Sequence, residues 1–168
     1  MSRPAVVLVG IPAAGKSTVG GLLAQALGLE LVETDDLVQG ELGLSTTEAF
    51  ADDEGQDSYH RAQERLAQVC LERECILALG SSAVESAQVR AALAGHRVIW
   101  LQISVVAATR RLGMARLGLE VLAAIRTKLD AQLAERAGWY EAVATEVIDT
   151  DRQNAEAIAA QILAHKEG

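Results

Sequence analysis

The segment 10–17, which reads GIPAAGKS, restricts the possible folds more than any other part of the chain. It matches the pattern G-x-x-x-x-G-K-[ST] at every fixed position. An apolar, β-branched run at 5–9 (AVVLV) precedes it and is typical of a strand buried on both faces. Residues 17–27 follow with apolar side chains at helical spacing, and Gly28 is placed to end that helix. This order predicts an α/β protein whose strand, loop and helix bind a nucleotide.

The residue types in the loop suit a triphosphate. Glycines let successive backbone N–H groups point inward, and the following helix presents the positive end of its dipole. Lys16 adds a charge for the β- and γ-phosphates, and the Ser17 hydroxyl is placed to ligate Mg²⁺. The alternative, an accidental glycine-rich turn, does not explain the strand before it and the helix after it. We therefore expect ATP and Mg²⁺ to bind here, with phosphate contacts from Gly10, Ala13, Ala14, Gly15, Lys16, Ser17 and Thr18.

The rest of the chain alternates strand and helix patterns. Further strands are predicted at 29–32, 75–79, 98–103 and 147–148. Helices are predicted at 35–42, 45–50, 57–73, 86–94, 119–136, 139–144 and 155–165, with another begun by Ser104, and an acidic loop at 52–55. This alternation predicts a three-layer α-β-α P-loop fold with a five-stranded, mainly parallel sheet, in one domain spanning 1–168.

Composition narrows the class of protein. The 168 residues carry a net charge of −8, which argues against broad nucleic-acid binding. Only 3% are aromatic, so the core must consist mainly of Ala, Val, Leu and Ile. Two cysteines, Cys70 and Cys75, make neither a disulfide framework nor a zinc site, and we expect them to be reduced and buried. The start of the chain does not resemble a signal peptide, and no stretch is long enough to span a membrane. We expect a cytoplasmic monomer that binds no membrane or nucleic acid.

A cluster of acidic residues follows the second predicted strand, in the order Glu33-Thr34-Asp35-Asp36. In an open parallel sheet, ligands bind outside the carboxyl ends of the strands, where these carboxylates would face the phosphate loop. One of these carboxylates, for which we take Glu33, is then placed to hold Mg²⁺ through water, and another to accept a proton from a substrate hydroxyl. The alternative is that the cluster only caps the helix that follows it.

Several motifs beyond the loop give the chain a resemblance to the shikimate kinase family over nearly its whole length. They are E-T-D at 33–35, F-A-x-x-x-G at 50–55, L-A-L-G at 77–80, V-R-A-A-L-A-G-H at 89–96, R-R at 110–111, E-R-A-x-x-Y at 135–140 and D-T-x-R-x-N at 149–154. The resemblance implies a nucleoside-monophosphate-kinase-like fold. It also implies transfer of the ATP γ-phosphate to the 3-hydroxyl of shikimate, a step in aromatic amino-acid biosynthesis.

The resemblance also implies roles for particular residues. Asp35 matches an aspartate that binds the substrate hydroxyls and is the candidate base, and Arg136 matches an arginine that binds the substrate carboxylate. Gly80, Ser81 and Ser82 fall on the segment that lines the substrate. On the nucleotide side, Arg111 matches the arginine that packs against adenine, and the adenine loop includes Arg152 and Asn154. A lid over approximately 113–122 would supply the catalytic Arg116.

The departures from the family pattern cluster at the acceptor side. Glu33 replaces an aspartate, Ser81 and Ser82 replace two glycines, and His60 replaces an arginine that clamps the carboxylate. The lid stretch at 116–119 lacks the family's proline. Two alternatives therefore stay open: a paralogue that phosphorylates another small hydroxylated compound, or a nucleotide-binding protein with little kinase activity.

The roles of four individual residues also admit an alternative. His60 would otherwise be a solvated helix position, and Arg136 a surface residue near a helix end. We interpret Trp139 and Tyr140 as packing residues rather than a stacking platform for a base.

Overall fold

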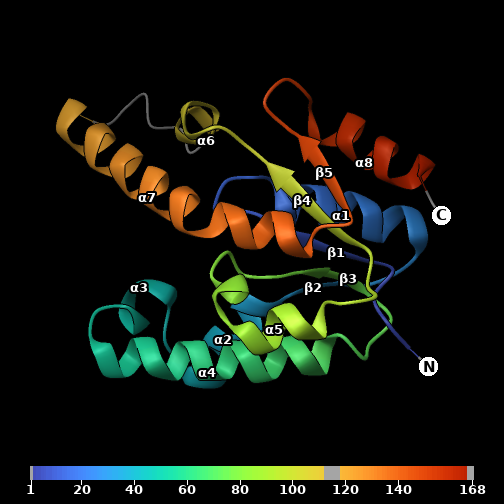
Figure 1. Ribbon diagram of the computed structural model, residues 1–168, viewed down its shortest axis with the longest axis horizontal. Coiled ribbons are helices and arrows are strands. Elements are labelled where there is room, and N and C mark those ends of the chain that lie inside the picture. Colours follow the sequence, from blue (N-terminus) through green and yellow to red (C-terminus); the bar gives the residue numbers. More distant parts are fainter. Residues whose placement is uncertain (1, 112–117, 166–168) are drawn as a thin grey trace.

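The structure, a computed structural model, describes residues 2–111 and 118–165 (Figure 1). Its centre is a five-stranded sheet in the order β2-β3-β1-β4-β5, in which all neighbouring strands run parallel. The strands are β1 Val6–Val9, β2 Leu31–Glu33, β3 Ile76–Ala78, β4 Val98–Gln102 and β5 Glu146–Asp149. The predicted five-stranded parallel sheet is confirmed, and each strand lies within two residues of its expected ends.

The order of the strands places the phosphate loop at the middle of the sheet. β1 is the central strand, and its Val7 pairs with Leu77 of β3 on one side and Val98 of β4 on the other. The chain turns to one side after β1 and later crosses to the opposite side at β4. Ligands bind at such a switch point, outside the carboxyl ends of the strands. The strand order therefore indicates a ligand site formed by the loops after β1, β2 and β3.

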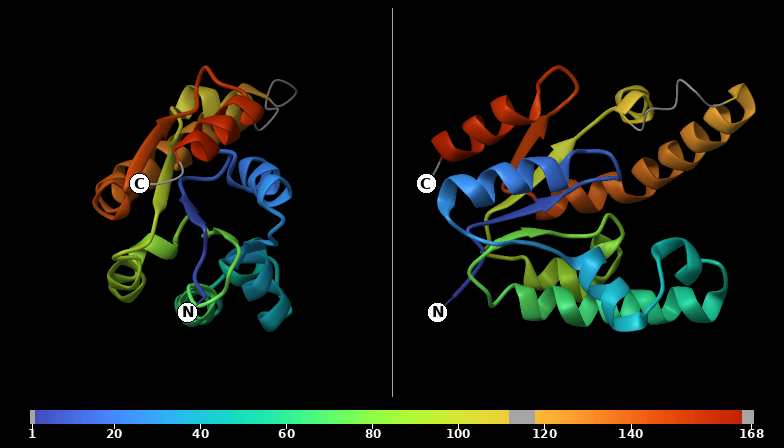
Figure 2. Two further views of the ribbon diagram at one scale, coloured as in Figure 1. Left: turned by 90° about the vertical axis from the view of Figure 1, so that its right-hand side faces the viewer. Right: turned by 180° about the vertical axis from the view of Figure 1, so that it is seen from behind.

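Helices cover both faces of the sheet, which confirms the three-layer fold (Figure 2). In the left-hand view, α1 and α8 lie on one side of the strands, and α5 and α7 lie on the other. α2 and α4 pack together at the β2 and β3 end of the molecule (Figure 1). The helices are α1 Lys16–Leu27, α2 Thr34–Leu42, α3 Thr46–Ala49, α4 Asp53–Cys70, α5 Ala87–Ala92, α6 Val105–Arg111, α7 Leu119–Val143 and α8 Ala155–Ala164, with a 3₁₀ turn at Ala83–Glu85.

Helix starts follow the capping signals in the sequence. Ser45 and Glu48 form a reciprocal capping box, with the Ser45 hydroxyl 3.1 Å from the Glu48 N–H and the Glu48 carboxylate 3.0 Å from the Ser45 N–H. The Ser86 hydroxyl accepts from the Val89 N–H, and the Ser104 hydroxyl accepts from the Ala107 N–H. These predicted caps are confirmed.

Two predicted boundaries are wrong. The acidic stretch expected as a loop at 52–55 begins α4, because the Asp52 carboxylate accepts from the Gly55 N–H at 2.7 Å and caps the helix four residues early. The two helices expected at 119–136 and 139–144 are one helix, α7. Gly138 lies inside it and does not break it. A helical glycine costs only about 1 kcal/mol, which packing of α7 on β4 and α6 can offset.

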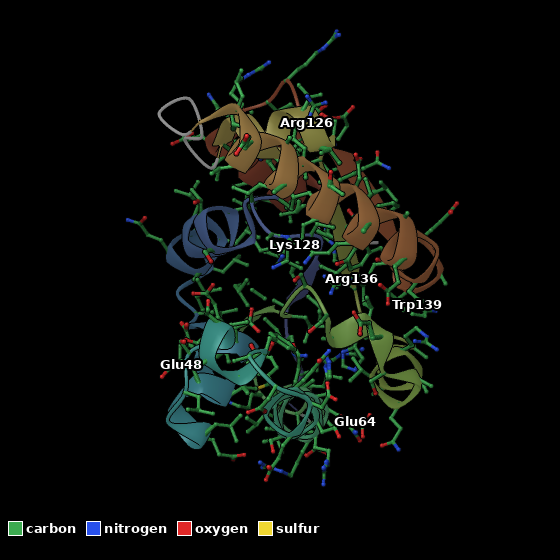
Figure 3. The ribbon with its side chains drawn as sticks, turned by 90° about the vertical axis from the view of Figure 1, so that its left-hand side faces the viewer. Glu48, Glu64, Arg126, Lys128, Arg136 and Trp139 are labelled. Atoms are coloured by element: carbon green, nitrogen blue, oxygen red, sulfur yellow. The ribbon has the colours of Figure 1, made fainter. Side chains whose placement is uncertain are left out.

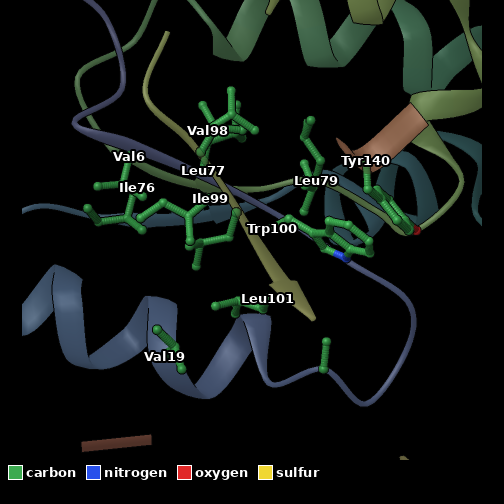
Figure 4. Packing of buried hydrophobic residues seen from close by; sticks show 14 of the residues in the cluster. Val6, Val19, Ile76, Leu77, Leu79, Val98, Ile99, Trp100, Leu101 and Tyr140 are labelled. Atoms are coloured by element: carbon green, nitrogen blue, oxygen red, sulfur yellow. The ribbon is translucent and has the colours of Figure 1, made fainter. Parts of the chain in front are cut away.

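The core consists mainly of Val, Leu and Ile side chains between the sheet and the helices (Figure 4). Two aromatic side chains add to it, with the rings of Trp100 and Tyr140 5.6 Å apart between centroids. Trp139 lies half-buried under the Arg90 guanidinium, 4.9 Å from the ring centroid. Trp139 and Tyr140 are thus packing residues, as interpreted from the sequence.

Both cysteines are buried free thiols, as expected. Burial raises the pKa of Cys70 and raises that of Cys75 to about 11, which keeps both thiols protonated at neutral pH. Among the described residues, no helix is both long enough and apolar enough to cross a membrane. Half of the predicted lid at 113–122 falls on 112–117, so Arg116 lies outside the described residues.

Candidate active site

The phosphate loop between β1 and α1 has the backbone conformation that the sequence implies. Gly10 and Gly15 have φ angles of 154° and 96°. A Cβ on Gly10 would lie 2.8 Å from the Leu101 carbonyl oxygen, so β4 leaves no room for a side chain there. Ala13 also has a positive φ, 71°, a conformation that costs an L-residue on the order of 1 kcal/mol. Backbone strain of this kind is characteristic of a ligand-binding loop.

The Lys16 side chain folds back onto the start of the phosphate loop. Its ammonium donates to the carbonyl oxygens of Gly10 at 2.6 Å and Ile11 at 3.2 Å. Burial lowers the pKa of Lys16 to about 8; Asp35 and Glu33 partly oppose this shift, while Arg136 adds to it. The amine is therefore charged at neutral pH, but it loses its proton more readily than an ordinary lysine.

Ser17 and Glu33 bring two oxygen ligands together beside the loop. The Ser17 hydroxyl donates to the Glu33 carboxylate across the ends of α1 and β2. Among the described residues no group of three or more His, Cys, Asp or Glu side chains is placed to hold a metal ion. One hydroxyl and one carboxylate fit Mg²⁺, which keeps several waters and takes its other ligands from substrate phosphates.

Two neighbouring cavities open at the carboxyl ends of the strands. The first, the phosphate cavity, has a volume of about 550 Å³ and is lined by Pro12, Ala13, Gly15, Lys16, Ser17, Thr18, Glu33, Asp35, Ala78, Leu79, Gly80 and Arg111. The second, the acceptor cavity, has a volume of about 450 Å³ and is lined by Pro12, Asp35, Thr46, Phe50, Gln56, Tyr59, His60, Ser81, Ser82, Glu85, Lys128, Gln132 and Arg136. Pro12 and Asp35 line both, so Asp35 lies where a phosphate and an acceptor would meet.

Asp35 is held in place from two sides. The Tyr59 hydroxyl of α4 donates to its carboxylate, and burial together with this carboxylate raises the pKa of Tyr59, so the phenol stays a donor. A Cβ on Gly80 would lie 2.3 Å from the Asp35 Oδ1, so the loop after β3 can approach Asp35 only with glycine there. The Gly80 N–H donates to the Thr34 hydroxyl at 2.8 Å and fixes this approach.

Arg136 is buried, with 8% of its surface exposed, so the alternative of a surface residue is wrong. It projects from α7 into the acceptor cavity, where its Nε lies 2.9 Å from the Glu85 Oε2 and its Nη1 donates to the Ser81 hydroxyl at 3.3 Å. Tyr140, one turn further along α7, donates to the Ser81 carbonyl at 2.6 Å. These bonds fix α7 to the loop after β3, which the sequence did not indicate.

Of the other residues predicted for the acceptor side, His60, Ser81 and Ser82 also line this cavity, whereas Gly80 lines the phosphate cavity. His60 is half-buried there and packs on Phe50, with 5.6 Å between ring centroids, so it is not the fully solvated position considered above. The Ser82 hydroxyl accepts from the Gln63 amide at 2.9 Å and is directed to α4. The structure therefore brings together His60, Ser81, Ser82 and Arg136 with Asp35, from four separate stretches of the chain.

The predicted adenine residues are only partly brought to the site. Arg111 lines the phosphate cavity and donates to the Ala14 carbonyl at 3.3 Å and to the Thr150 carbonyl, which joins the phosphate loop to the loop after β5. Arg152 is exposed, and the Asn154 carboxamide caps α8 by accepting from the Ala157 N–H at 2.8 Å. Neither lines the phosphate cavity, so their contact with adenine stays a prediction.

Sequence reasoning missed several residues of the acceptor cavity. Lys128 and Gln132 precede Arg136 on α7 at intervals of four, which places all three on one face of that helix. Figure 3 shows Lys128 and Arg136 pointing from α7 toward α2 and α4, while Arg126 points elsewhere. Counting back from Arg136 at intervals of four would have identified Gln132 and Lys128 from the sequence. Glu85 lies in a 3₁₀ turn with no pattern around it, and no sequence signal marks it.

Comparison with known proteins agrees with this geometry. A family model described as shikimate kinase matches residues 12–167. The shikimate kinase of Mycobacterium tuberculosis (strain ATCC 25177 / H37Ra) is 41% identical over 162 residues, covering 95% of this chain and 92% of that protein. The shikimate kinase of Thermobifida fusca (strain YX) is 37% identical over 165 residues, covering 97% and 94%. The solved shikimate kinase of Acinetobacter baumannii in complex with shikimate superposes with a TM-score of 0.81 at 26% identity, covering 97% of this chain and 92% of that one.

Proposed function

We propose that this chain, which belongs to the shikimate kinase family, transfers the γ-phosphoryl group of ATP to the 3-hydroxyl of shikimate. The observation that carries this proposal is the position of Asp35, which lines both the phosphate cavity and the acceptor cavity. A phosphoryl group and a hydroxyl brought to Asp35 from the two sides would meet with a carboxylate within reach. Phosphoryl transfer depends mainly on such positioning and on charge stabilisation.

Each reactant has a set of residues in this arrangement. The backbone N–H groups of the loop and the Lys16 ammonium bind the phosphates and stabilise the charge that develops on them. Asp35 orients the acceptor hydroxyl and takes its proton as the oxygen attacks the γ-phosphorus and ADP leaves. Ser17 and Glu33 would hold Mg²⁺, which neutralises charge on the β- and γ-phosphates. Arg136 faces the acceptor cavity with the positive charge that a carboxylate on the acceptor needs.

Turnover with shikimate tests the proposal directly. ADP formation is followed with ATP, Mg²⁺ and shikimate for the wild type and for Asp35→Asn. We expect shikimate-dependent turnover, and a fall in kcat of about 10²- to 10⁴-fold in Asp35→Asn, the range that a general base contributes. Affinity for ATP should change little. Asp36→Asn is the matched control, because Asp36 is exposed and lines neither cavity.

A second candidate acceptor is favoured by one observation. Glu85 pairs with Arg136 inside the acceptor cavity, and His60 supplies no guanidinium there. A small polyol without a carboxylate would suit such a cavity. Turnover with a neutral polyol but not with shikimate would replace the named acceptor, whereas tight ATP binding without turnover on any acceptor would favour a nucleotide-binding module.

We further propose that the chain acts as a single-domain, cytoplasmic monomer. Among the described residues, this chain itself supplies groups for both reactants, with Lys16 and Ser17 beside the phosphates and Asp35 and Arg136 beside the acceptor. Sedimentation of the purified protein with ATP and shikimate present should give the mass of one chain, 17.8 kDa.

A further inference from the structure

We propose that Glu85 determines the specificity of the acceptor cavity by competing with the acceptor's carboxylate for Arg136. This inference rests on the proposed function, because it concerns how an acceptor binds beside Asp35. It assigns a role to a residue that the sequence did not single out. Glu85 would lower the affinity for anionic acceptors while leaving the affinity for uncharged ones unchanged.

The ion pair occupies the side of Arg136 that a carboxylate would use. The Arg136 Nε and Nη2 atoms both lie 2.9 Å from the Glu85 Oε2. These two nitrogens form one edge of the guanidinium, the edge suited to a bidentate carboxylate. The third nitrogen, Nη1, donates to the Ser81 hydroxyl at 3.3 Å. An incoming carboxylate must therefore displace Glu85 or bind beside it.

The pair is shielded from water, which makes the competition strong. The side chains of Arg136 and Glu85 are 10% and 26% exposed, and both line the acceptor cavity. Interactions between charges are stronger in such a site than at a solvated surface. A carboxylate that entered without displacing Glu85 would place two anions at one guanidinium, with Asp35 as a third carboxylate in the same cavity. Repulsion of this kind is how a site rejects one ligand in favour of another.

Among the described residues, the other cation that lines the cavity does not remove this competition. Lys128 lies two helical turns before Arg136 on the same face of α7, and its side chain is exposed at the cavity. It pairs with no carboxylate among the described residues. An ammonium on a solvated, flexible stem is a weaker and less directional partner than a buried guanidinium. Arg136 therefore stays the main carboxylate ligand, and Glu85 controls its availability.

The substitution Glu85→Gln tests the proposal without removing the hydrogen-bond partner of Arg136, since the amide oxygen can still accept a hydrogen bond from the guanidinium. Steady-state kinetics are measured with shikimate and with its methyl ester, which lacks the negative charge. For shikimate we expect KM to fall by about tenfold or more, the worth of one charge-assisted hydrogen bond. For the ester, KM should stay within about twofold, since no charge competes with Glu85. The KM for ATP should not move.

Glu64→Gln is the matched control. The Glu64 carboxylate accepts from the Ser86 hydroxyl on the other side of the same 3₁₀ turn and does not line the acceptor cavity. This substitution should leave the KM for shikimate and the KM for its methyl ester unchanged. A shift of KM for shikimate and for the ester in parallel, or a rise of KM for shikimate in Glu85→Gln, would overturn the proposal and make Glu85 a positioning residue for Arg136.

Direct binding separates this inference from the proposed function. Calorimetric titration of shikimate into the wild type and into Glu85→Gln needs no turnover. If neither protein phosphorylates either acceptor, the proposed function fails, yet tighter shikimate binding by Glu85→Gln would still support the competition. Equal affinity, or no binding by either protein, would reject it. Thermal unfolding of both proteins checks that the variant is folded.

Discussion

Lys16 is a residue whose ordinary chemistry is strongly changed by its surroundings. Its ammonium lies against two loop carbonyls, and burial lowers its pKa to about 8. A polyphosphate at the loop would replace much of the lost solvation with opposite charge and raise this pKa again. The protonation state of one side chain is thus coupled to nucleotide binding.

This coupling predicts a pH dependence of nucleotide affinity. Below about pH 8 Lys16 is already charged in the free protein, so binding takes up no proton there. Above that pH, binding must add a proton, and affinity for ATP should fall by up to about tenfold per pH unit until the pKa of the complex is reached. The Kd for ATP is measured with Mg²⁺ from about pH 7.5 to 9.5, a range that includes the pKa of Lys16 in the free protein.

Lys16→Met supplies the control for this measurement. Its binding should be weaker at every pH and nearly independent of pH over the same range, because the titrating amine is gone. The same slope in wild type and Lys16→Met would show that another group titrates and that the lowered pKa of Lys16 does not control affinity.

At the scale of single elements, α4 decides what lines the acceptor cavity. Its early start at Asp53 sets the length of the helix that carries Tyr59 and His60 into that cavity. The Asp52 cap and the close approach of Gly55 to α3 fix this start, since a Cβ on Gly55 would lie 2.3 Å from the Ala49 carbonyl oxygen. A local capping interaction thus contributes to the geometry of a site about two turns away.

Removing the cap should therefore destabilise the protein. Asp52→Ala should lower the free energy of unfolding by about 1 kcal/mol, the usual worth of an N-cap. In a chain of this size that corresponds to about 2 to 4 °C in Tm. Asp57→Ala removes the same charge from an exposed position within α4 and is the control, for which we expect little change. Equal losses in the two variants would indicate a general charge effect and not a cap.

Across the whole molecule, one bidentate ion pair lies at the end of the parallel strands opposite to the site. The site lies at the carboxyl ends, whereas Arg97, just before β4, joins three elements at the other end. Its guanidinium donates to the Glu146 carboxylate of β5 at 2.6 and 3.0 Å and to the Ile162 carbonyl of α8 at 2.9 Å. Both side chains of the ion pair are about three-quarters buried.

Arg97→Met should accordingly reduce stability without changing catalysis. Loss of a partly buried, bidentate ion pair and a bond to a main-chain carbonyl should cost about 1 to 3 kcal/mol. Arg73→Met breaks an ion pair with Glu30 that is far more exposed, and should cost less than about 1 kcal/mol. Denaturant unfolding compares the two, and kcat per folded molecule should equal that of the wild type. A fall in kcat for Arg97→Met would contradict this separation.

The sequence by itself determined the features that depend on neighbouring residues. The phosphate loop occupies eight consecutive positions, and the caps at Ser45 and Ser86 involve residues three apart. The carboxylates Glu33 and Asp35 were placed correctly because they follow a strand whose end the apolar pattern marks. These features are local, so their physical causes lie within one stretch of the chain.

Only the tertiary structure decided which distant side chains meet. Arg136 and Glu85 lie 51 positions apart, and their contact depends on how α7 crosses the loop after β3. The continuity of α7 through Gly138 and the central place of β1 in the sheet likewise come from packing between elements. Burial then strengthens the interactions between these side chains. A charge that is removed from water depends mainly on the few groups that contact it.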